Sequence, residues 1–174
     1  MLDDGGADHL EPGLALPSIQ LASTGGGTVD LSALAGRSLL IVYPWTGRPG
    51  RPNPPDWDDI PGAHGSTPEL EGFRDCHAHF AVLGLRLFGL SRQKTTYQHE
   101  LAERLTLPFP ILSDSSGRLA AELGLPAFTT GGEIYLERLT LLLRDGCIEA
   151  VFFPVRDPAG HAAEVQAWLS SRTP

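Results

Sequence analysis

Residues 38–43 read SLLIVY, and this short apolar run is the segment from which the fold can be worked out. Its apolar residues are continuous rather than alternating, and it is rich in residue types that favour strands. Such a run is typical of a strand that is buried on both faces of a sheet. We therefore expect residues 38–43 to form a central strand, with Pro44 directly after it.

Downstream of this strand, strand patterns and helix patterns alternate along the chain. The expected helices start at Thr67, 95, 118 and 162, and the expected strands cover 85–90 and 109–112. Residues 135–144 and 147–155 form a predicted β-hairpin, because Asp145-Gly146 between them is a strong turn signal. This order predicts an α/β fold in which a mixed central sheet carries helices on both faces.

An N-terminal β-hairpin is expected before the central strand. Residues 14–21 suit a short strand interrupted by Pro17, residues 23–27 are a glycine-rich turn, and residues 28–31 resume the strand pattern. Residues 1–11 are acidic and glycine-rich, and they lack the basic and apolar regions of a signal peptide. We therefore expect a flexible tail over residues 1–11.

Composition and charge restrict the partners and the location of the protein. The 174-residue chain has a formal net charge of −8, which disfavours binding to nucleic acid or to an anionic membrane surface. Its only cysteines are Cys76 and Cys147, which excludes a disulfide framework and favours a reducing compartment. No apolar run approaches the roughly 18 residues of a membrane span. We expect a cytoplasmic protein in which residues 12–174 form one domain.

A proline-rich segment over residues 44–65 interrupts the regular pattern. It contains six of the chain's 15 prolines, so it is unsuited to a helix or to a central strand. Loops of this length inside a compact domain are uncommon and often functional. We expect Trp45, Trp57 and Ile60 to hold this insertion against the body of the domain.

The segment GAHGSTPELEGFRD, residues 62–75, joins a glycine-rich turn to the start of a predicted helix. A side chain at a helix N-terminus meets unpaired N–H groups and the positive end of the dipole, which stabilise a thiolate. Ser66 gains much less, because a hydroxyl is a far weaker acid and needs a neighbouring base. His64 is near in sequence, but the G-x-S-x-G pattern of serine hydrolases is absent. The alternative is that Ser66 or Thr67 only caps the helix, with Pro68 at its first position.

Four other residues are candidates for a chemical role. Cys76 and His79 are three positions apart on the predicted helix and could reach one metal ion, but we favour a core cysteine and a solvated histidine. Cys147 is expected to be an ordinary strand residue. Arg138 interrupts an otherwise apolar strand, where a charge either has a partner or a function, or lies on an edge strand.

Several segments, taken in order, resemble a peroxiredoxin of the bacterioferritin comigratory (thiol-specific antioxidant) type. They are VDLSALAGRSLLIVYP at 29–44, GSTPELEGFRD at 65–75, LFGLS at 87–91, LPFPILSD at 107–114 and RLTLLLRDGCIEAVFFPV at 138–155. The resemblance covers residues 12–170. It implies a thioredoxin-like fold, which agrees with the order of strands and helices above.

The resemblance places Ser66 where the family carries its peroxidatic cysteine. Glu71 stands where many members carry a resolving cysteine, and Glu69 matches an acidic or amide position. Arg138 corresponds to the strand arginine that helps to activate the thiolate. The family's threonine three residues before the cysteine is absent, because position 63 is alanine, and Thr46 is its candidate displaced relative across the insertion.

The resemblance implies thiol-dependent reduction of hydrogen peroxide or alkyl hydroperoxides in a form with cysteine at position 66. Thr67 and Arg138 would polarise the peroxide and stabilise the thiolate. The reductant would be an external thiol, or Cys76 or Cys147 after a local rearrangement. No cofactor or metal would be needed, and the protein would be a homodimer. Serine cannot be oxidised in this way, so we expect peroxidase activity to be lost with Ser66, whether the serine is natural or engineered. The alternative function is a non-catalytic binding or regulatory module.

Overall fold

The computed structural model describes residues 6–172, and it confirms an α/β fold with a mixed sheet in the order β2-β1-β5-β4-β3-β8-β9. The strands of this sheet are β1 (Leu21–Ser23), β2 (Thr28–Val29), β3 (Arg37–Val42), β4 (Leu85–Ser91), β5 (Ile111–Ser113), β8 (Leu139–Arg144) and β9 (Cys147–Phe152). A separate two-stranded sheet contains β6 (Ala127–Thr130) and β7 (Glu133–Leu136). The helices are α1 (Ser66–Asp75), α2 (His77–Val82), α3 (Thr95–Arg104), α4 (Arg118–Leu123) and α5 (His161–Ser170), with 3-10 turns η1 (Leu31–Ala33) and η2 (Trp57–Asp59). None of the helices within residues 6–172 is long and apolar enough to cross a membrane.

Strand β3 is the central strand that the run SLLIVY predicts. It pairs in parallel with β4 on one side and antiparallel with β8 on the other. Leu39 and Ile41 belong to the apolar cluster on one face of the sheet, and Leu40 and Val42 belong to the cluster on the other face. All four are completely buried, which explains why the run is continuous rather than alternating.

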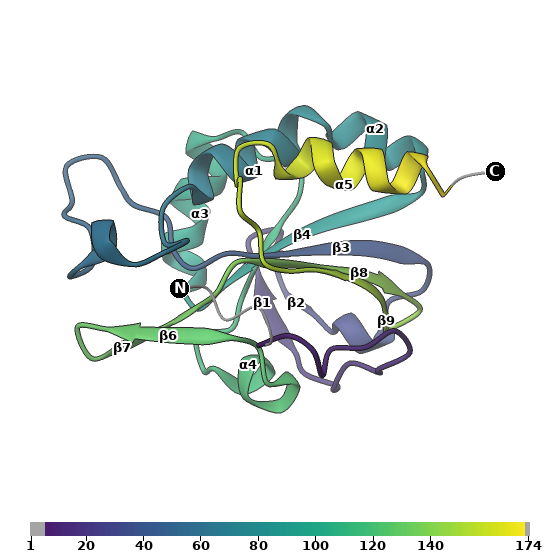
Figure 1. The fold of residues 1–174 in the computed structure, drawn as a ribbon, viewed down its shortest axis with the longest axis horizontal. Helices are drawn as coiled ribbons and strands as arrows, with labels where there is room; N and C mark the ends of the chain where they lie inside the picture. Colours follow the sequence, from purple (N-terminus) through teal and green to yellow (C-terminus); the bar gives the residue numbers. More distant parts are fainter. Residues whose placement is uncertain (1–5, 173–174) are drawn as a thin grey trace.

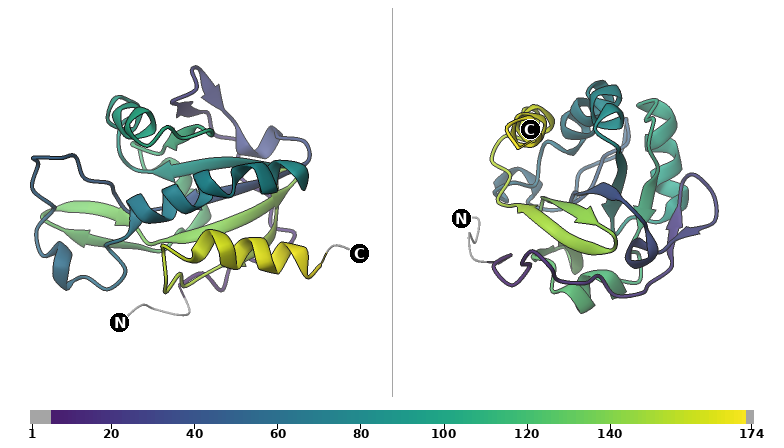
Figure 2. Two further views of the ribbon diagram at one scale, coloured as in Figure 1. Left: turned by 90° about the horizontal axis from the view of Figure 1, so that it is seen from above. Right: turned by 90° about the vertical axis from the view of Figure 1, so that its right-hand side faces the viewer.

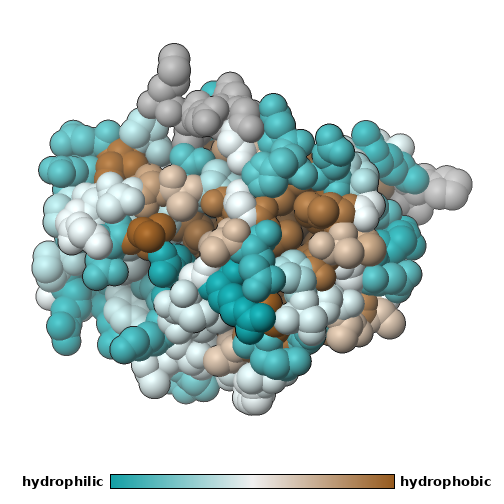
Figure 3. Space-filling view, turned by 90° about the horizontal axis from the view of Figure 1, so that it is seen from below, coloured by the Kyte–Doolittle hydropathy of each residue, from teal (hydrophilic) through white to brown (hydrophobic). Residues whose placement is uncertain are grey.

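Helices cover the two faces of the sheet unequally (Figures 1 and 2). On the upper face of Figure 1, α1, α2, α3 and α5 contribute side chains such as Phe73, Phe80, Leu101 and Val165 to one apolar cluster. On the lower face, α4, η1 and the N-terminal segment cover the other cluster. Seen from below, the molecule shows apolar residues among the polar ones (Figure 3).

The N-terminal hairpin is present as β1 and β2, but residues 14–20 are not one of its strands. This segment instead runs beside the start of β9, where the Ile148 N–H donates to the Leu14 carbonyl at 2.9 Å. Pro17 has no N–H to donate, so it cannot extend the pairing into a regular ladder.

The tail expected over residues 1–11 lies partly outside the described residues. In the described part, Ala7 and Leu10 are buried in the lower apolar cluster. His9 Nε2 lies 2.9 Å from the carbonyl oxygen of Leu123, at the end of α4. Residues 7–10 are therefore packed against the domain rather than free in solution.

The strand predicted over residues 135–144 is in fact divided into β7 and β8. The division comes at Glu137, whose N–H donates to the carbonyl of Pro126 at 2.8 Å instead of to the large sheet. Arg138 therefore lies between two strands, and its interpretation as an edge-strand charge is wrong. Apolar residues resume directly after Glu137-Arg138, so the pattern alone does not tell a broken strand from one that carries two charged residues.

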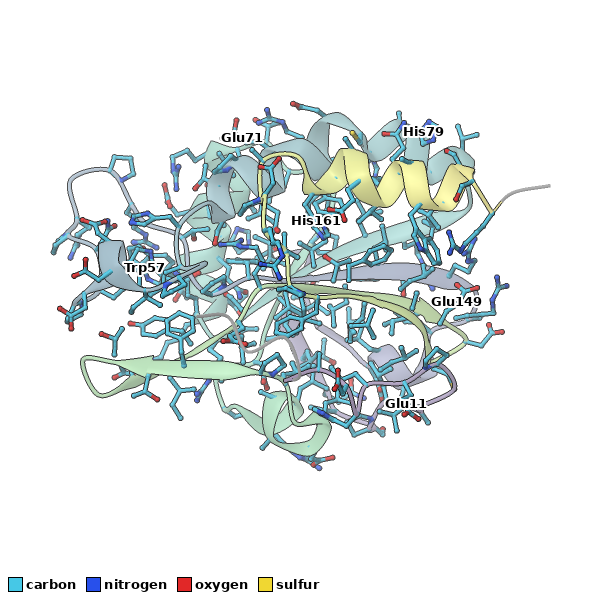
Figure 4. The ribbon with its side chains drawn as sticks, in the orientation of Figure 1. Glu11, Trp57, Glu71, His79, Glu149 and His161 are labelled. Carbon is cyan, nitrogen blue, oxygen red and sulfur yellow. The ribbon has the colours of Figure 1, made fainter. Side chains whose placement is uncertain are left out.

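The proline-rich insertion is held against the β6–β7 hairpin by aromatic rings, and Figure 4 shows Trp57 between the two segments. The ring of Trp57, a residue only 3% exposed, has its centroid 5.4 Å from that of Trp45 and 5.1 Å from that of Tyr135. The Thr130 hydroxyl donates to the carbonyl of Pro55 at 2.6 Å. The expectation is therefore confirmed for Trp57, whereas the ring of Trp45 packs on Trp57 within the insertion, and the role of Ile60 stays a prediction.

Replacing Trp57 by alanine is expected to release the insertion while the domain stays folded. The ring contacts of Trp57 join the insertion to the hairpin, and Trp57 belongs to neither apolar cluster of the large sheet. Removing a buried aromatic side chain costs about 3–5 kcal/mol. Proteinase K should then cut within residues 44–65, while the far-ultraviolet circular dichroism of the folded chain is retained.

Proteinase K suits this measurement because both arginines of the insertion precede proline, which makes trypsin ineffective. The matched control is Trp168→Ala on α5, which removes an indole that contacts Phe152 and leaves the insertion in place. Equal resistance of the insertion in Trp57→Ala and in the unchanged chain would contradict the role assigned to Trp57.

Candidate active site

A pocket of about 220 Å³ opens beside the N-terminus of α1. The insertion supplies eight of its eleven lining residues, including Trp45, Thr46 and Trp57, and α1 supplies Ser66–Pro68. The segment that interrupts the regular sequence pattern is thus also the principal wall of the pocket.

Ser66 is the first residue of α1 and is only 3% exposed. Gly65 precedes it at φ 109°, a left-handed conformation that favours glycine, and a Cβ there would lie 2.8 Å from Pro158. The expectation that Ser66 or Thr67 caps the helix is wrong, because Gly65 is the cap residue. Pro68 is the third helical residue rather than the first, which is tolerated because N–H groups in the first turn have no helical acceptor.

Arg138 is buried beneath the pocket, with 4% of the residue exposed. Its Nη1 donates to Glu69 Oε1 at 3.1 Å, and its Nη2 donates to Ser66 Oγ at 3.2 Å. Nη2 also lies within 3.1–3.4 Å of the carbonyl oxygens of residues 62–64. The structure therefore brings Ser66, Glu69 and Arg138 together, as the resemblance implies, although the catalytic roles of these residues remain a proposal.

Glu69 carries the negative charge nearest to Arg138, and it is completely buried. Burial raises the pKa of Glu69 to about 7, and the charge of Arg138 acts in the opposite direction. The second carboxylate oxygen of Glu69 has no hydrogen-bond partner within the described residues. A carboxyl group in this setting gains or loses its proton close to neutral pH.

Thr46 lines the same pocket as Ser66 from the opposite end of the insertion. Its N–H and hydroxyl both donate to Gln93 Oε1 at 3.3 Å, and its carbonyl accepts from Gln93 Nε2 at 3.1 Å and from the Tyr97 hydroxyl at 2.9 Å. The long insertion thus returns Thr46 to the site.

Gln93 and Tyr97 are functional candidates that sequence reasoning missed. Gln93 follows the carboxyl end of β4, a strand parallel to its neighbours β3 and β5. Polar residues after the carboxyl ends of parallel strands are often near a site. That signal was available at Gln93, but the contact with Thr46 depends on the path of the insertion, which no short pattern predicts.

The described contacts do not provide Ser66 with a base. Within residues 6–172, the hydrogen-bond partner of the Ser66 hydroxyl is Arg138, which is a donor. His64 also lines the pocket, but its Nε2 lies 2.6 Å from Asp58 Oδ1 on the insertion. This arrangement does not favour a serine hydrolase.

Glu71 and the two cysteines lie away from the pocket lining. Glu71 is half-exposed near the top of α1 (Figure 4), with an oxygen 3.6 Å from Arg74 Nη2. Cys76 lies between α1 and α2 rather than within one long helix, and both it and Cys147 are free thiols. No group of three or more metal-ligating side chains occurs in the part of the chain that is described, so Cys76 and His79 find no further ligand there.

His161 is a second buried titratable residue, and it belongs to none of the sequence motifs described above. It lies beneath the start of α5 (Figure 4), where its Nε2 is 2.9 Å from Thr140 Oγ1. Burial lowers the pKa of His161, and Glu164, 3.5 Å from its Nδ1, acts in the opposite direction. The contact with Thr140 links the start of α5 to strand β8.

The raised pKa of Glu69 predicts a pH-dependent contribution to stability. Between the usual carboxyl pKa of 4.5 and the folded value of about 7, the folded state binds a proton that the unfolded state releases. Stability from this group therefore falls as pH rises through that window and becomes constant above it. The difference in Tm between the unchanged chain and Glu69→Gln should fall as pH is raised from about 5 to about 8.

Glu71→Gln is the matched control for this titration, because Glu71 lies on the same helix but is half-exposed. Its Tm difference should show no comparable slope. A flat difference curve for Glu69→Gln over the whole range would show that Glu69 stays ionised in the folded protein.

Comparison with known sequences places this fold and site in a family. The family model described as Redoxin matches residues 11–167. The chain is 26% identical over 160 residues to the chloroplastic peroxiredoxin Q of Oryza sativa subsp. japonica, covering 91% of this chain and 66% of that protein. It is 29% identical over 161 residues to a peroxiredoxin named bcp from Coxiella burnetii, covering 90% of this chain and 96% of that protein. The chain thus spans slightly less than two thirds of the rice protein and almost all of the bacterial one.

Solved structures show the same fold. Peroxidoxin BcpB of Mycobacterium tuberculosis superposes with a TM-score of 0.75 at 24% identity, covering 95% of this chain and all of that one. The bacterioferritin comigratory protein of Xanthomonas campestris superposes with a TM-score of 0.73 at 25% identity, covering 92% and 98%. A cysteine-to-serine mutant of PrxQ from Xylella fastidiosa gives a TM-score of 0.75 at 24% identity, covering 94% and 97%.

The matched region contains the central strand β3, the insertion, α1 and Arg138, so the resemblance drawn from the sequence motifs is confirmed. The chain belongs to the Redoxin family, and within it to the peroxiredoxins of the bacterioferritin comigratory (peroxiredoxin Q) type.

Proposed function

We propose that the pocket at Ser66 is a peroxidase site that lacks only the sulfur atom of its nucleophile. The observation that supports this most strongly is the 3.2 Å contact between Arg138 Nη2 and Ser66 Oγ at the start of α1. A thiolate at position 66 would meet a buried cation and the unpaired N–H groups of a helix N-terminus, and both favour the charged form.

The chemistry of a cysteine at this position can be written in full. The thiolate attacks the nearer oxygen of a hydroperoxide, so that an S–O bond forms as the O–O bond breaks. The leaving alkoxide or hydroxide takes up a proton, and the sulfur is oxidised to a sulfenic acid. An external thiol then reduces the sulfenic acid, because position 71 is glutamate rather than a resolving cysteine.

The side chains around position 66 have distinct roles in this proposal. Arg138 stabilises the thiolate and the developing charge on the leaving oxygen, and Glu69 holds Arg138 in place. Thr67, next to Ser66 on the pocket wall, polarises the peroxide, and Thr46 contacts it from across the pocket. Glu71 is outside the pocket and takes no part.

The substrates, the location and the oligomeric state of the protein are part of the same proposal. Hydrogen peroxide and alkyl hydroperoxides are the proposed substrates, and neither a nucleic acid nor a membrane is a partner. A cytoplasmic location suits the two free thiols, and a homodimer is the proposed assembly.

A second function, non-catalytic binding or regulation, is favoured by the residues at positions 66 and 71. Both lack sulfur, while the pocket, Arg138 and Glu69 are all in place. A serine hydroxyl in this pocket can still hydrogen-bond a small ligand without being oxidised by it.

Restoring the thiol is the direct test of the peroxidase proposal. With excess dithiothreitol as reductant, the chain as given should not consume peroxide, and Ser66→Cys should consume it. The comparison should then be repeated with Cys76→Ser and Cys147→Ser in both proteins, so that position 66 of the Ser66→Cys protein carries the chain's only cysteine.

Arg138→Met in the Ser66→Cys protein is the companion variant. It should slow peroxide consumption by about 10²-fold and raise the thiol pKa, measured from thiolate absorbance. An inert Ser66→Cys protein that is folded would overturn the peroxidase proposal and leave the binding function. Activity in the chain as given would instead mean that Ser66 is not at the reacting position.

A further inference from the structure

We propose that Gln93 is a positioning residue, which fixes the Thr46 hydroxyl so that the pocket accepts a hydrogen bond from its ligand. This inference deepens the function proposed above and rests on it for the identity of the ligand. Gln93 does not line the pocket that contains Ser66, so it acts on a ligand only through Thr46.

The orientation of the Gln93 amide is determined by the backbone of Thr46. The Thr46 N–H requires an acceptor and faces Oε1 at 3.3 Å, whereas the Thr46 carbonyl requires a donor and faces Nε2 at 3.1 Å. If the amide were turned over, Nε2 would face the Thr46 N–H and Oε1 would face the Thr46 carbonyl. A donor would then meet a donor, and an acceptor would meet an acceptor. The positions of its oxygen and nitrogen therefore follow from the main chain.

The same oxygen then determines the direction of the Thr46 hydroxyl. Gln93 Oε1 lies 3.3 Å from Thr46 Oγ1 and has no proton of its own, so Thr46 is the donor in this contact. The lone pairs of Thr46 Oγ1 are left for the pocket. A ligand atom that approaches Thr46 must carry a proton.

This direction selects a chemical class of ligand. A neutral hydroperoxide presents an O–H that Thr46 Oγ1 can accept, whereas a carboxylate of similar size presents only acceptors. Two facing acceptors repel, and the buried hydroxyl, on a residue 2% exposed, is then left without water to relieve the contact. Protonated hydroperoxides are therefore preferred to carboxylates, although Arg138 and the helix N-terminus alone would favour the anion.

Gln93 is itself held by the carboxyl ends of two strands. Its N–H donates to Ser91 Oγ at 3.3 Å, at the end of β4, and its carbonyl accepts from Ser113 Oγ at 2.6 Å, at the end of β5. The ends of the parallel strands β4 and β5 thus fix Gln93. Gln93 in turn fixes Thr46, which lies in the insertion, a segment without strand hydrogen bonds.

The first experiment measures ligand selectivity in the chain as given, where Ser66 prevents turnover. Trp45 and Trp57 line the pocket, so their fluorescence reports occupancy. tert-Butyl hydroperoxide is titrated against pivalate, its carboxylate counterpart of similar bulk. The hydroperoxide should bind about tenfold more tightly, the factor expected of one favourable hydrogen bond. Gln93→Met should remove this preference.

The second experiment uses Ser66→Cys with tert-butyl hydroperoxide as substrate. Gln93→Met should raise KM about tenfold while the thiol pKa and its rate of alkylation by iodoacetamide stay unchanged. Thr46→Val should have the same effect, and the double variant should be no worse than either alone, because both act through one hydroxyl. A residue that only supports the fold would not give this pattern.

Gln20→Met is the matched control, since Gln20 contacts Asp30 and Thr28 rather than Ser91 or Thr46. It should leave selectivity as it is. An unaltered preference in Gln93→Met, additive losses in the double variant, or no hydroperoxide binding to the chain as given would each overturn the inference. If Ser66→Cys is inert but the serine protein keeps a preference that depends on Gln93, the peroxidase proposal fails and the positioning role stands.

Discussion

The arrangement of the pocket depends on one buried cation, the guanidinium of Arg138. A charge that has lost its water must be balanced and hydrogen-bonded, and breaking such a pair on one side costs about 3–5 kcal/mol. Glu69 supplies the paired carboxyl group, which balances the charge when it is ionised, and the carbonyls of residues 62–64 and the Ser66 hydroxyl supply acceptors. The carbonyls end the insertion, whereas Ser66 and Glu69 begin α1. One side chain therefore fixes the junction at which the pocket opens, and it can do so because the chain leaves the small sheet at Glu137 just before Arg138.

The insertion can line a pocket because it is held at three places. Gln93 and Tyr97 hold its start at Thr46, Trp57 packs its middle against the β6–β7 hairpin, and Arg138 holds its end. Its six prolines reduce the freedom that an unfolded loop of this length would otherwise lose on ordering. A segment that looks irregular in sequence is thus well determined in structure, by contacts with residues far from it in the chain.

The parts of the fold that the sequence predicts are those set by local pattern. The continuous apolar run at 38–43 identifies β3, and the turn at Asp145-Gly146 identifies the β8–β9 hairpin. The motif around Ser66 and the isolated charge of Arg138 identify the pocket. What local pattern misses are non-local contacts: the break before Arg138, the Cys76 interruption between α1 and α2, and the return of Thr46 to Gln93. The return of Thr46 depends on a partner 47 residues away, and the break before Arg138 coincides with the backbone hydrogen bond from Glu137 to Pro126, and neither contact leaves a periodic signal.

The contacts that build the pocket do not depend on whether position 66 carries an oxygen or a sulfur atom. None of the contacts that hold Arg138, Glu69 or Thr46 requires sulfur, and the Ser66 hydroxyl satisfies the same Arg138 donor that a thiolate would. A serine there is buried but hydrogen-bonded, so it carries little of the penalty of an unsatisfied polar group. Glu71, which the sequence resemblance aligns with a resolving cysteine, is half-exposed and lies away from the pocket lining. The fold and the arrangement of charged and polar groups around position 66 therefore do not depend on a sulfur atom there, and under the function proposed above a cysteine would enter a site that is already formed.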